Sequence, residues 1–257
     1  MSSVIKRKLN WRGLLIPVLF VVLWSVASAL NWVNPKLIPA PVHVLSIAWN
    51  SLITAEFWQG VSASLLRDIT GFVIGSILAI SFGVLIGTSK WANYVFAPSF
   101  NVLRQVSLFA WLPLITTFLE YGNSAKILFI TLSVFYPVAL HTIEGVRNIP
   151  LNQYEVAKVY QFSLWQLLRK LILPSAAPQI FVGLQLGLIF AWLAAIGSEF
   201  LLANYGVGLG NIIIRGRAGL NVGLIVFGLV FIGLIGIALN ALATRLERRW
   251  LVWRQVG

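Results

Sequence analysis

The stretch Glu155-Val-Ala-Lys-Val-Tyr-Gln-Phe-Ser-Leu-Trp-Gln-Leu-Leu-Arg-Lys-Leu-Ile-Leu-Pro174 lies between two strongly apolar runs. It is too polar to span a bilayer and too regularly patterned to be a plain loop. The pattern predicts two short helices joined by a turn, with Ser163 as the N-cap of the second helix. Held at a membrane surface, such a segment is suited to docking on another protein.

The composition of the chain is that of an integral membrane protein. Of its 257 residues, 59% are hydrophobic and only 10% are charged, whereas a soluble domain has about 25% charged residues. The net charge of +12 comes from basic clusters between apolar runs, which suits membrane topology rather than nucleic-acid binding. The absence of cysteine excludes disulfides, thiol catalysis and cysteine metal sites.

Six apolar runs predict an all-α integral membrane protein with six transmembrane helices in one domain, residues 1–257. The expected spans are about 14–30, 69–87, 104–119, 127–143, 180–198 and 222–243, and the two short helices occupy 150–174. The first run resembles a signal peptide that ends at Ala27-Ser28-Ala29, but further apolar runs follow, so we expect a retained span. Between the first two spans, an amphipathic stretch predicts an interfacial helix.

The distribution of Lys and Arg predicts the orientation. Fourteen of the 19 basic residues fall on one side of the expected spans: Lys6, Arg7, Lys8, Arg12, Lys90, Arg104, Arg147, Lys158, Arg169, Lys170, Arg245, Arg248, Arg249 and Arg254. The other side has Lys36, Arg67, Lys126, Arg215 and Arg217. The positive-inside rule therefore places both termini and the 150–174 segment in the cytoplasm.

Small residues recur every four positions in two of the expected spans. The second span has Gly71, Gly75, Gly83 and Gly87, and the fifth has Gly183-x-x-x-Gly187. In lipid, such spacing lets helix backbones approach closely. It indicates either packing inside one bundle or a contact at a subunit interface or translocation path.

Polar residues at membrane depth are candidate functional residues. Glu199 directly follows the fifth span, and Arg215 or Arg217 is its expected partner unless it simply lies in interfacial water. Arg104 either faces the bundle interior, where it would attract an anion, or extends to the cytoplasmic surface. The candidates for the translocation path are Arg67, Arg104, Trp111, Phe135, Trp192 and Glu199. For the aromatic residues, packing or lipid contact is the alternative.

Known catalytic and nucleotide-binding motifs are absent from the sequence. It contains no phosphate-binding G-x-x-x-x-G-K-[ST], no His-Glu-x-x-His, no Gly-x-Ser-x-Gly and no carboxylate pair at helical spacing within a span. His141 and Glu144 suggest a cap or pair near the interface rather than a metal site. We therefore expect a non-catalytic chain driven by a partner. A membrane-embedded enzyme or a secondary transporter, which would show internal repeats, remains the alternative.

The 155–174 segment resembles the signature of ABC importer permeases, in which E-A-A is followed by a glycine and a helix ending in Leu-Pro. Glu155, Ala157, Ser163, Leu173 and Pro174 stand at matching places. Flanking stretches are similar to the nitrate/sulfonate/taurine branch and, in the second half, to aliphatic-sulfonate permeases. These stretches are Leu108-Phe-Ala-Trp-Leu-Pro-Leu114, Ser124-Ala-Lys126, Phe135-Tyr-Pro137, Ala191-Trp-Leu193, Gly206-Val-Gly208 and Leu246-Glu-Arg-Arg-Trp250. The resemblance covers about residues 64–253.

The resemblance implies a type I ABC importer permease fold in the bacterial inner membrane, with several passes and cytoplasmic termini. A pair of permeases, expected to be two copies of this chain, would form the pathway. Two ABC ATPase subunits would bind ATP and Mg, so that this chain needs no cofactor, metal or catalytic residue of its own. A periplasmic or lipid-anchored binding protein would deliver a small anion: an alkanesulfonate, or alternatively nitrate, taurine or bicarbonate.

The resemblance also assigns the ATPase-coupling residues. They are Tyr154, Glu155, Val156, Ala157, Val159, Tyr160, Gln161, Phe162 and Ser163. The family glycine between the two coupling helices falls at Gln161. A non-glycine residue in a left-handed turn costs about 1 kcal/mol. Either this turn has another shape, or the strain is accepted.

Overall fold

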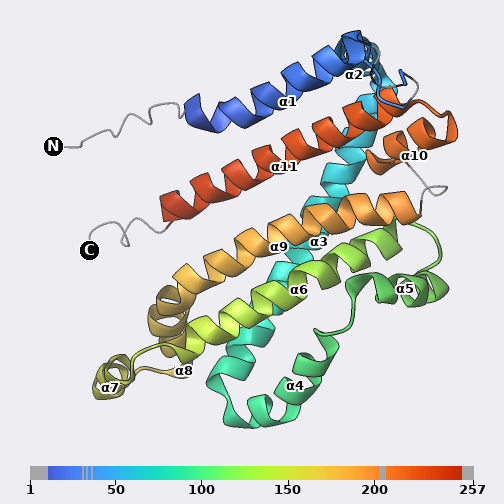
Figure 1. Ribbon diagram of the computed structural model, residues 1–257. Coiled ribbons are helices and arrows are strands. Elements are labelled where there is room, and N and C mark those ends of the chain that lie inside the picture. Colours follow the sequence, from blue (N-terminus) through green and yellow to red (C-terminus); the bar gives the residue numbers. More distant parts are fainter. Residues whose placement is uncertain (1–10, 31, 33, 36, 203–206, 251–257) are drawn as a thin grey trace. The chain divides into compact units, whose positions relative to one another are not determined.

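The computed structural model describes residues 11–30, 32, 34–35, 37–202 and 207–250, with the side chains of 11–14 excepted. This part of the chain contains helices and turns and no strand (Figure 1). The first three helices are α1 (Trp11–Ala29), α2 (Pro41–Leu52) and α3 (Ala55–Thr88). The middle of the chain forms α4 (Lys90–Leu103), the 3-10 turn η1 (Leu108–Ala110), α5 (Trp111–Leu119) and α6 (Asn123–Arg147). It continues with α7 (Leu151–Val159), α8 (Leu164–Leu167), the π-helical turn η2 (Leu168–Ile172), α9 (Leu173–Leu201), α10 (Gly210–Ala218) and α11 (Val222–Trp250).

The chain divides into two compact units. The first comprises Met1–Trp58 and Ile212–Phe231, and the second comprises Gln59–Asn211 and Ile232–Gly257. In the first unit, Trp24 Nε1 donates to the Pro39 carbonyl at 3.0 Å, which ties α1 to the segment before α2. The rings of Phe57, Phe227 and Phe231 pack together there, with centroids 4.8–5.9 Å apart.

The second unit is built on α3, α6 and α9. The four glycines of α3 lie against α6: a Cβ atom would lie 2.7 Å from Ile130 Cβ at Gly71, 2.9 Å from Val134 Cβ at Gly75, 2.6 Å from Thr142 Cβ at Gly83 and 2.7 Å from Val146 Cβ at Gly87. These contacts, which we call the glycine seam, require glycine because any side chain would displace α6. On α9, Gly183 and Gly187 pack against α6 in the same manner. The spacing predicted from the sequence therefore serves packing inside the unit.

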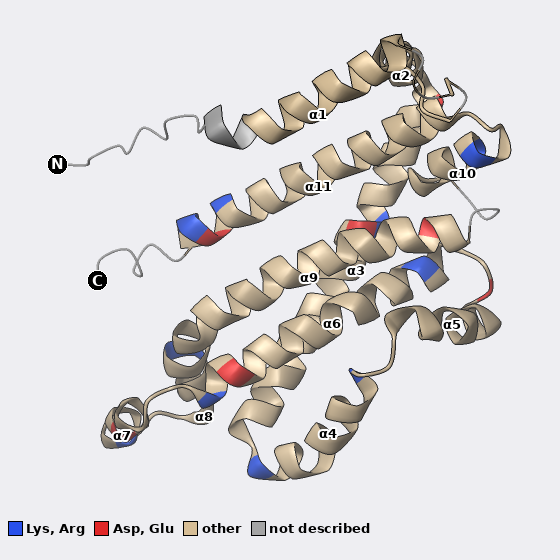
Figure 2. Cartoon of the chain, viewed as in Figure 1, with Lys and Arg blue, Asp and Glu red and all other residues tan. Residues whose placement is uncertain are grey.

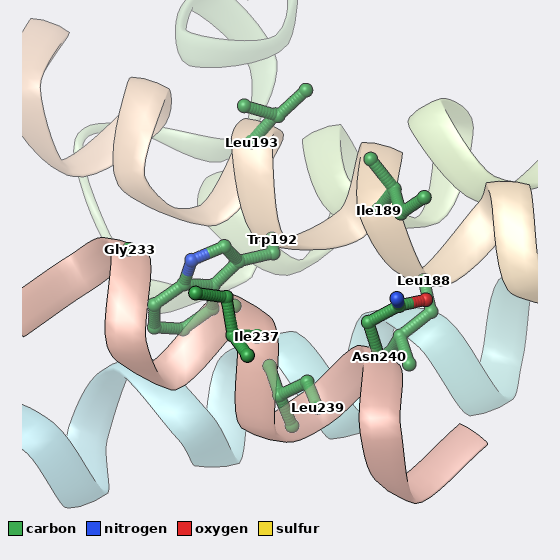
Figure 3. Close-up of a pocket in the computed structure, with 9 residues that line it drawn as sticks. Leu188, Ile189, Trp192, Leu193, Gly233, Ile237, Leu239 and Asn240 are labelled. Carbon is green, nitrogen blue, oxygen red and sulfur yellow. The ribbon is translucent and has the colours of Figure 1, made fainter. Parts of the chain in front are cut away.

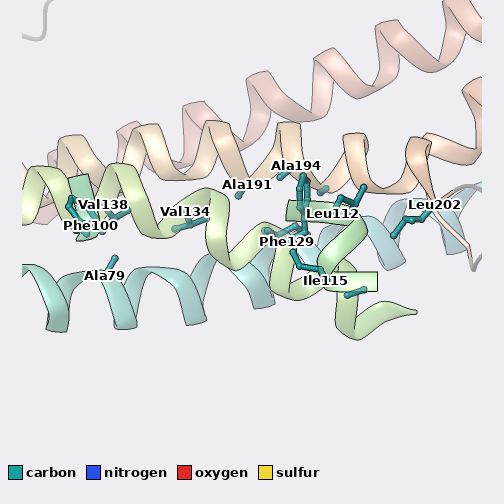
Figure 4. Packing of buried hydrophobic residues seen from close by; sticks show 14 of the residues in the cluster. Ala79, Phe100, Leu112, Ile115, Phe129, Val134, Val138, Ala191, Ala194 and Leu202 are labelled. Carbon is teal, nitrogen blue, oxygen red and sulfur yellow. The ribbon is translucent and has the colours of Figure 1, made fainter. Parts of the chain in front are cut away.

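Apolar side chains fill the space between these helices (Figure 4). Ala79, Phe129, Val134, Val138 and Ala191 are completely buried there. A second, smaller cluster lies nearer to α7 and α8 and contains Val146, Ile149, Ile172, Ala176 and Ile180.

Four helices are long and apolar enough to cross a membrane: Ala55–Thr88, Asn123–Arg147, Leu164–Leu201 and Val222–Trp250. A fifth crossing is possible if Lys90–Leu103 and Leu108–Leu119, which meet at 88°, form one broken span. The apolar helix Leu15–Ala29 is shorter. The described residues are thus those of a multi-pass helical membrane protein with four or five such spans.

The segment expected as the third span differs from the prediction. Arg104 to Ser107 are not helical, and the helix begins only with η1 and α5. Pro113 explains the start of α5, because proline lacks the amide hydrogen that an earlier turn would need and is tolerated only in the first turn of a helix. The sequence pattern showed the apolar run, but not the break before it.

Candidate functional site

The two short helices predicted between the apolar runs are α7 and α8, which with η2 form what we call the docking hairpin, residues 150–174. Ser163 N-caps α8, as predicted: its hydroxyl accepts the Gln166 N–H at 3.3 Å. The Gln166 side chain accepts the Ser163 N–H at 3.0 Å in return. This capping box satisfies two amide groups that the start of a helix would otherwise leave free.

The turn before Ser163 accepts a strained backbone. Gln161 has a φ of 50°, in the left-handed region that glycine adopts at lower cost. Its N–H donates to the Lys158 carbonyl at 2.9 Å, and the Phe162 N–H donates to the Ala157 carbonyl at 3.0 Å. This is the Schellman arrangement, which needs a left-handed residue at the position of Gln161. The turn therefore keeps its shape without glycine.

The docking hairpin has an inner and an outer side. Ala157 is buried and Tyr154 packs against the smaller apolar cluster, and this burial raises the pKa of the Tyr154 phenol. On the outer side, Val156, Val159 and Tyr160 are 55%, 81% and 72% exposed. Apolar side chains with such exposure on a surface hairpin mark a contact site for a partner. Glu155 is exposed beside them.

At the opposite end of α9, a buried ion pair joins two distant parts of the second unit. Arg67 on α3 donates through Nη1 to Glu199 Oε1, although 132 residues separate them. Ser64, one turn before Arg67, donates to the same carboxylate at 2.7 Å and accepts the Leu209 N–H at 2.9 Å. We call Ser64, Arg67 and Glu199 the buried clamp.

The buried clamp holds the chain that follows α9. Arg67 Nη2 donates to the Val207 carbonyl, and Glu199 Oε2 accepts the Gly210 N–H at 2.9 Å. Gly210 begins α10, so the carboxylate lies at the positive end of that helix. A Cβ atom at Gly208 would overlap the Glu199 carboxylate, and one at Gly210 would lie 2.7 Å from Glu199 Cβ. Both glycines are therefore required by the close approach of Glu199.

Further polar side chains surround the buried clamp. Asn123 Oδ1 accepts from Arg67 Nε at 2.9 Å. Lys126 is 1% exposed and lies within electrostatic range of Arg67 and Glu199. Asp68 is completely buried, and neither of its carboxylate oxygens has a hydrogen-bond partner among the described residues. Two basic and two acidic side chains are thus buried in helices that otherwise carry few charges (Figure 2).

The structure corrects the partner expected for Glu199. Arg215 instead pairs with Glu56 at 2.6 Å in the first unit, where both side chains are mostly exposed. The true partner, Arg67, precedes Glu199 by half the chain. His141 Nδ1 does lie 3.7 Å from Glu144 Oε2, as expected. Among the described residues, no group of three or more His, Asp or Glu could hold a metal ion.

The six candidates for the translocation path do not form one cluster. Arg67 and Glu199 neutralise each other inside the buried clamp. Trp111 and Phe135 are partly buried against the main apolar cluster, and Arg104 is exposed at the end of α4. Trp192 packs in a groove of about 310 Å³ between α9 and α11, with its indole N–H donated to the Ile232 carbonyl at 3.2 Å (Figure 3). The groove is apolar apart from Asn240.

Sequence reasoning missed Ser64 and Asn123 as members of the polar network. Asn123 begins α6, a position at which capping is the ordinary expectation, and Ser64 lies in the third turn of α3, where a serine ordinarily bonds to the backbone of its own helix. The sequence did contain one sign that Ser64 belongs to a polar site. Ser64 and Asp68 are four residues apart, which places both on one face of α3.

Comparison with known proteins agrees with this geometry. The SsuC proteins of Bacillus subtilis and Escherichia coli, named for aliphatic sulfonates transport, are 30% and 32% identical to this chain, covering 97% and 93% of it and 90% of each relative. The bicarbonate transport system permease protein CmpB of Synechococcus elongatus is 30% identical over 95% of this chain and 92% of its own length. A solved structure titled as an inward-facing MetNI methionine ABC transporter matches with a TM-score of 0.64 at 19% identity, covering 76% of this chain and 95% of the other.

This match to MetNI supports the type I importer permease fold, and the relatives are transport permeases rather than enzymes or secondary transporters. The family described as "binding-protein-dependent transport system inner membrane component" matches residues 71–252, which include the docking hairpin and, of the buried clamp, Glu199. The chain belongs to this family: it is a non-catalytic, multi-pass permease subunit of an ABC importer in the inner membrane, working with an ATPase and a substrate-binding protein.

Proposed function

We propose that two copies of this chain form the translocation pathway for a small organic anion, most closely an alkanesulfonate. Two ATPase subunits that bind ATP and Mg dock on the hairpins, and a periplasmic or lipid-anchored binding protein delivers the substrate. The names of the SsuC relatives support the sulfonate, while those of CmpB and of the nitrate import permease NrtB of Synechocystis support bicarbonate or nitrate as the alternative.

One observation carries the proposed mechanism: the docking hairpin continues without interruption into α9. The helix from Leu164 to Leu201 has 38 residues, which corresponds to roughly 55 Å at 1.5 Å per residue. Its first turns belong to the hairpin, and its last turn contains Glu199 of the buried clamp. A displacement of the hairpin by the ATPase therefore reaches the far end of α9, where Glu199 holds the following chain segment.

The proposal includes six spans in a single permease domain, with both termini in the cytoplasm. Two of the five basic residues expected on the outer side, Arg67 and Lys126, are buried in helices. The number of exposed basic residues on that side is therefore smaller than the sequence suggests. Arg147 and Asn93 join at 2.5 Å at the hairpin end of the second unit. Lys6, Arg7, Lys8 and Arg254, which also support this orientation, lie outside the described residues. The positive-inside rule thus favours a cytoplasmic hairpin.

The six path candidates differ in burial, and we assign them different roles. Arg67 and Glu199 position helices and the chain after α9, because their charges are already paired. Trp111, Phe135 and Trp192 remain candidates to line the pathway when two copies meet. Among the six candidates, Arg104 is the basic residue that is exposed and could attract an anion.

The test is co-purification of the tagged chain with its co-expressed ATPase in detergent, with ATP turnover as the readout. Turnover should rise with the cognate binding protein and one of methanesulfonate, taurine, nitrate or bicarbonate. Glu155→Lys should reduce ATPase association, because it reverses the charge on the outer side of the hairpin, while the matched control Glu120→Lys, also exposed, should not. Normal association and turnover with Glu155→Lys would contradict the coupling role of the hairpin.

A further inference from the structure

The segment that leads from the docking hairpin into α9 has a cavity on each of two neighbouring faces. The first is a groove of about 530 Å³ between this segment and the last turns of α3. Its lining is Ile80, Ser81, Val84, Leu85, Thr88, Leu164, Leu167, Leu168, Ile172 and Leu173. All of these residues belong to the second unit.

The groove suits an aliphatic occupant. Its lining includes only two polar side chains, and both hydroxyls are already bonded within α3: Ser81 donates to the Ile77 carbonyl at 2.8 Å, and Thr88 donates to the Val84 carbonyl at 2.8 Å. An apolar chain in the groove therefore leaves no hydroxyl of its lining without a partner. Because α3 is a membrane-spanning helix, the hydrocarbon available to its last turns is that of lipid acyl chains.

The second cavity has the opposite character. It measures about 330 Å³ and is lined by Trp165, Gln166, Arg169 and Lys170. Neither Arg169 nor Lys170 forms an ion pair with a carboxylate of the described residues, and both are exposed. Lys170 Nζ lies 5.5 Å from the centroid of the Phe162 ring, which places its charge beside the hairpin turn. Trp is typical of the interface between hydrocarbon and head groups.

The π-helical turn brings these two cavities together. Leu168 to Ile172 form η2, so that Leu168 and Ile172 line the groove while Arg169 and Lys170 line the cationic cavity. Single π-helical turns within α-helices occur frequently at functional sites. An apolar groove and a cationic cavity therefore lie on adjacent residues. An anionic phospholipid has the matching two parts, because its acyl chains are apolar and its phosphate is negatively charged.

We propose that this segment binds an anionic phospholipid, with an acyl chain in the groove and the phosphate at Arg169 and Lys170. Basic pockets beside transmembrane helices on the cytoplasmic side bind such head groups. The bound lipid would fix the docking hairpin at the membrane surface, next to the point where α9 begins. This inference rests on the membrane placement in the proposed function, and it adds a ligand that acts on the coupling segment.

The experiment measures lipid retained by the purified chain, without any ATPase, by native mass spectrometry in detergent. The probes are dioleoyl phosphatidylglycerol and dioleoyl phosphatidylcholine, which share their acyl chains and differ in head-group charge. We expect preferential retention of phosphatidylglycerol, and a loss of roughly tenfold in that preference for Arg169→Gln/Lys170→Gln. The matched control, Arg245→Gln/Arg248→Gln, removes two basic residues from the end of α11 and should keep the preference.

A second variant tests the groove separately. Ser81 is exposed in the groove, so Ser81→Phe should fill it and reduce retention of both lipids, whereas Leu78→Phe, which lies outside the lining, should not. Equal retention of the two lipids, or equal losses in the Arg245/Arg248 control, would overturn the proposal. So would displacement by excess inorganic phosphate, which indicates a simple anion site, or a change of oligomeric state in Ser81→Phe, which indicates a second copy in the groove.

Failure of this proposal and failure of the proposed function are distinguishable. Lipid retention is measured on the chain alone, while the coupling function is measured by ATPase association. A chain that binds its ATPase but shows no preference among lipids refutes only the lipid site.

Discussion

The guanidinium of Arg67 on α3 and the carboxylate of Glu199 at the end of α9 form an ion pair in which the side chains are only 7% and 1% exposed. Both ions are therefore almost completely removed from solvent. A buried pair of this kind adds little to stability compared with apolar packing, but loss of one partner leaves the other charge uncompensated. The pair acts mainly to fix which segments meet: α3, the end of α9 and the chain that begins α10.

Arg67→Gln and Glu199→Gln should each destabilise the protein by about 3–5 kcal/mol, because each leaves a buried charge unpaired. The double variant should lose less than the sum of the two single losses, because it removes both charges. The measurement is denaturant-induced loss of helical signal in detergent. Glu56→Gln, at the exposed pair with Arg215, is the control and should cost less than about 1 kcal/mol. Additive losses in the double variant would contradict the pairing.

Gly83→Ala should destabilise the second unit, because the new Cβ atom would lie 2.6 Å from Thr142 Cβ. Overpacking of this kind typically costs about 1–3 kcal/mol. Gly233 on α11 is the matched control, since a Cβ atom there meets nothing within 4 Å. Gly233→Ala should be neutral or stabilising by up to about 1 kcal/mol through helix propensity. Thermal unfolding in detergent distinguishes the two, and equal shifts would argue against the seam.

Gly208→Ala should weaken the hold of the buried clamp on the chain after α9, since its methyl group would overlap the Glu199 carboxylate. Amide exchange at Gly210, whose N–H is bonded to Glu199 Oε2, should become faster, while exchange in α7 remains unchanged. Gly122→Ala is the control, because a Cβ atom at Gly122 has open space around it. Unchanged exchange at Gly210 in Gly208→Ala would show that the close approach to Glu199 is not required.

Gln161→Gly should stabilise the docking hairpin by about 1 kcal/mol, because glycine adopts the left-handed conformation at lower cost. The readout is amide exchange of Phe162, whose N–H is bonded to the Ala157 carbonyl. Exchange should slow by roughly fivefold, the factor that about 1 kcal/mol represents. Gln161→Ala retains a Cβ atom and should leave the rate unchanged. If exchange at Phe162 slowed in both variants, relief of backbone strain at Gln161 would not explain the slower exchange.

Features set by neighbouring residues could be predicted from the sequence. Ser163 and Gln166 form a capping box within four residues, and a left-handed turn at Gln161 was one of the two shapes that the sequence left open. The glycine spacing of α3 likewise indicated close helix packing. All of these depend on local spacing, which the sequence displays directly.

Features set by contacts between distant helices could not be predicted. Glu199 pairs with Arg67 rather than with Arg215, because the fold of the second unit brings the start of α3 to the end of α9. Hydrophobic periodicity identifies each helix but gives no distance between two of them. For the same reason, the apolar run after Arg104 did not reveal the 88° bend that separates α4 from α5.

The glycine seam also limits how the protein can move. Four contacts in register along α3 and α6 leave no room for one helix to slide past the other, since each glycine faces a β-branched side chain of α6 and the contacts recur after one or two turns. Transport-linked motion must then displace α3 and α6 together as a rigid body. Bending is then expected where the helical hydrogen-bond pattern is interrupted outside the seam, as at Arg104–Ser107 and at the Gln161 turn. Both hinges lie beside the seam rather than within it.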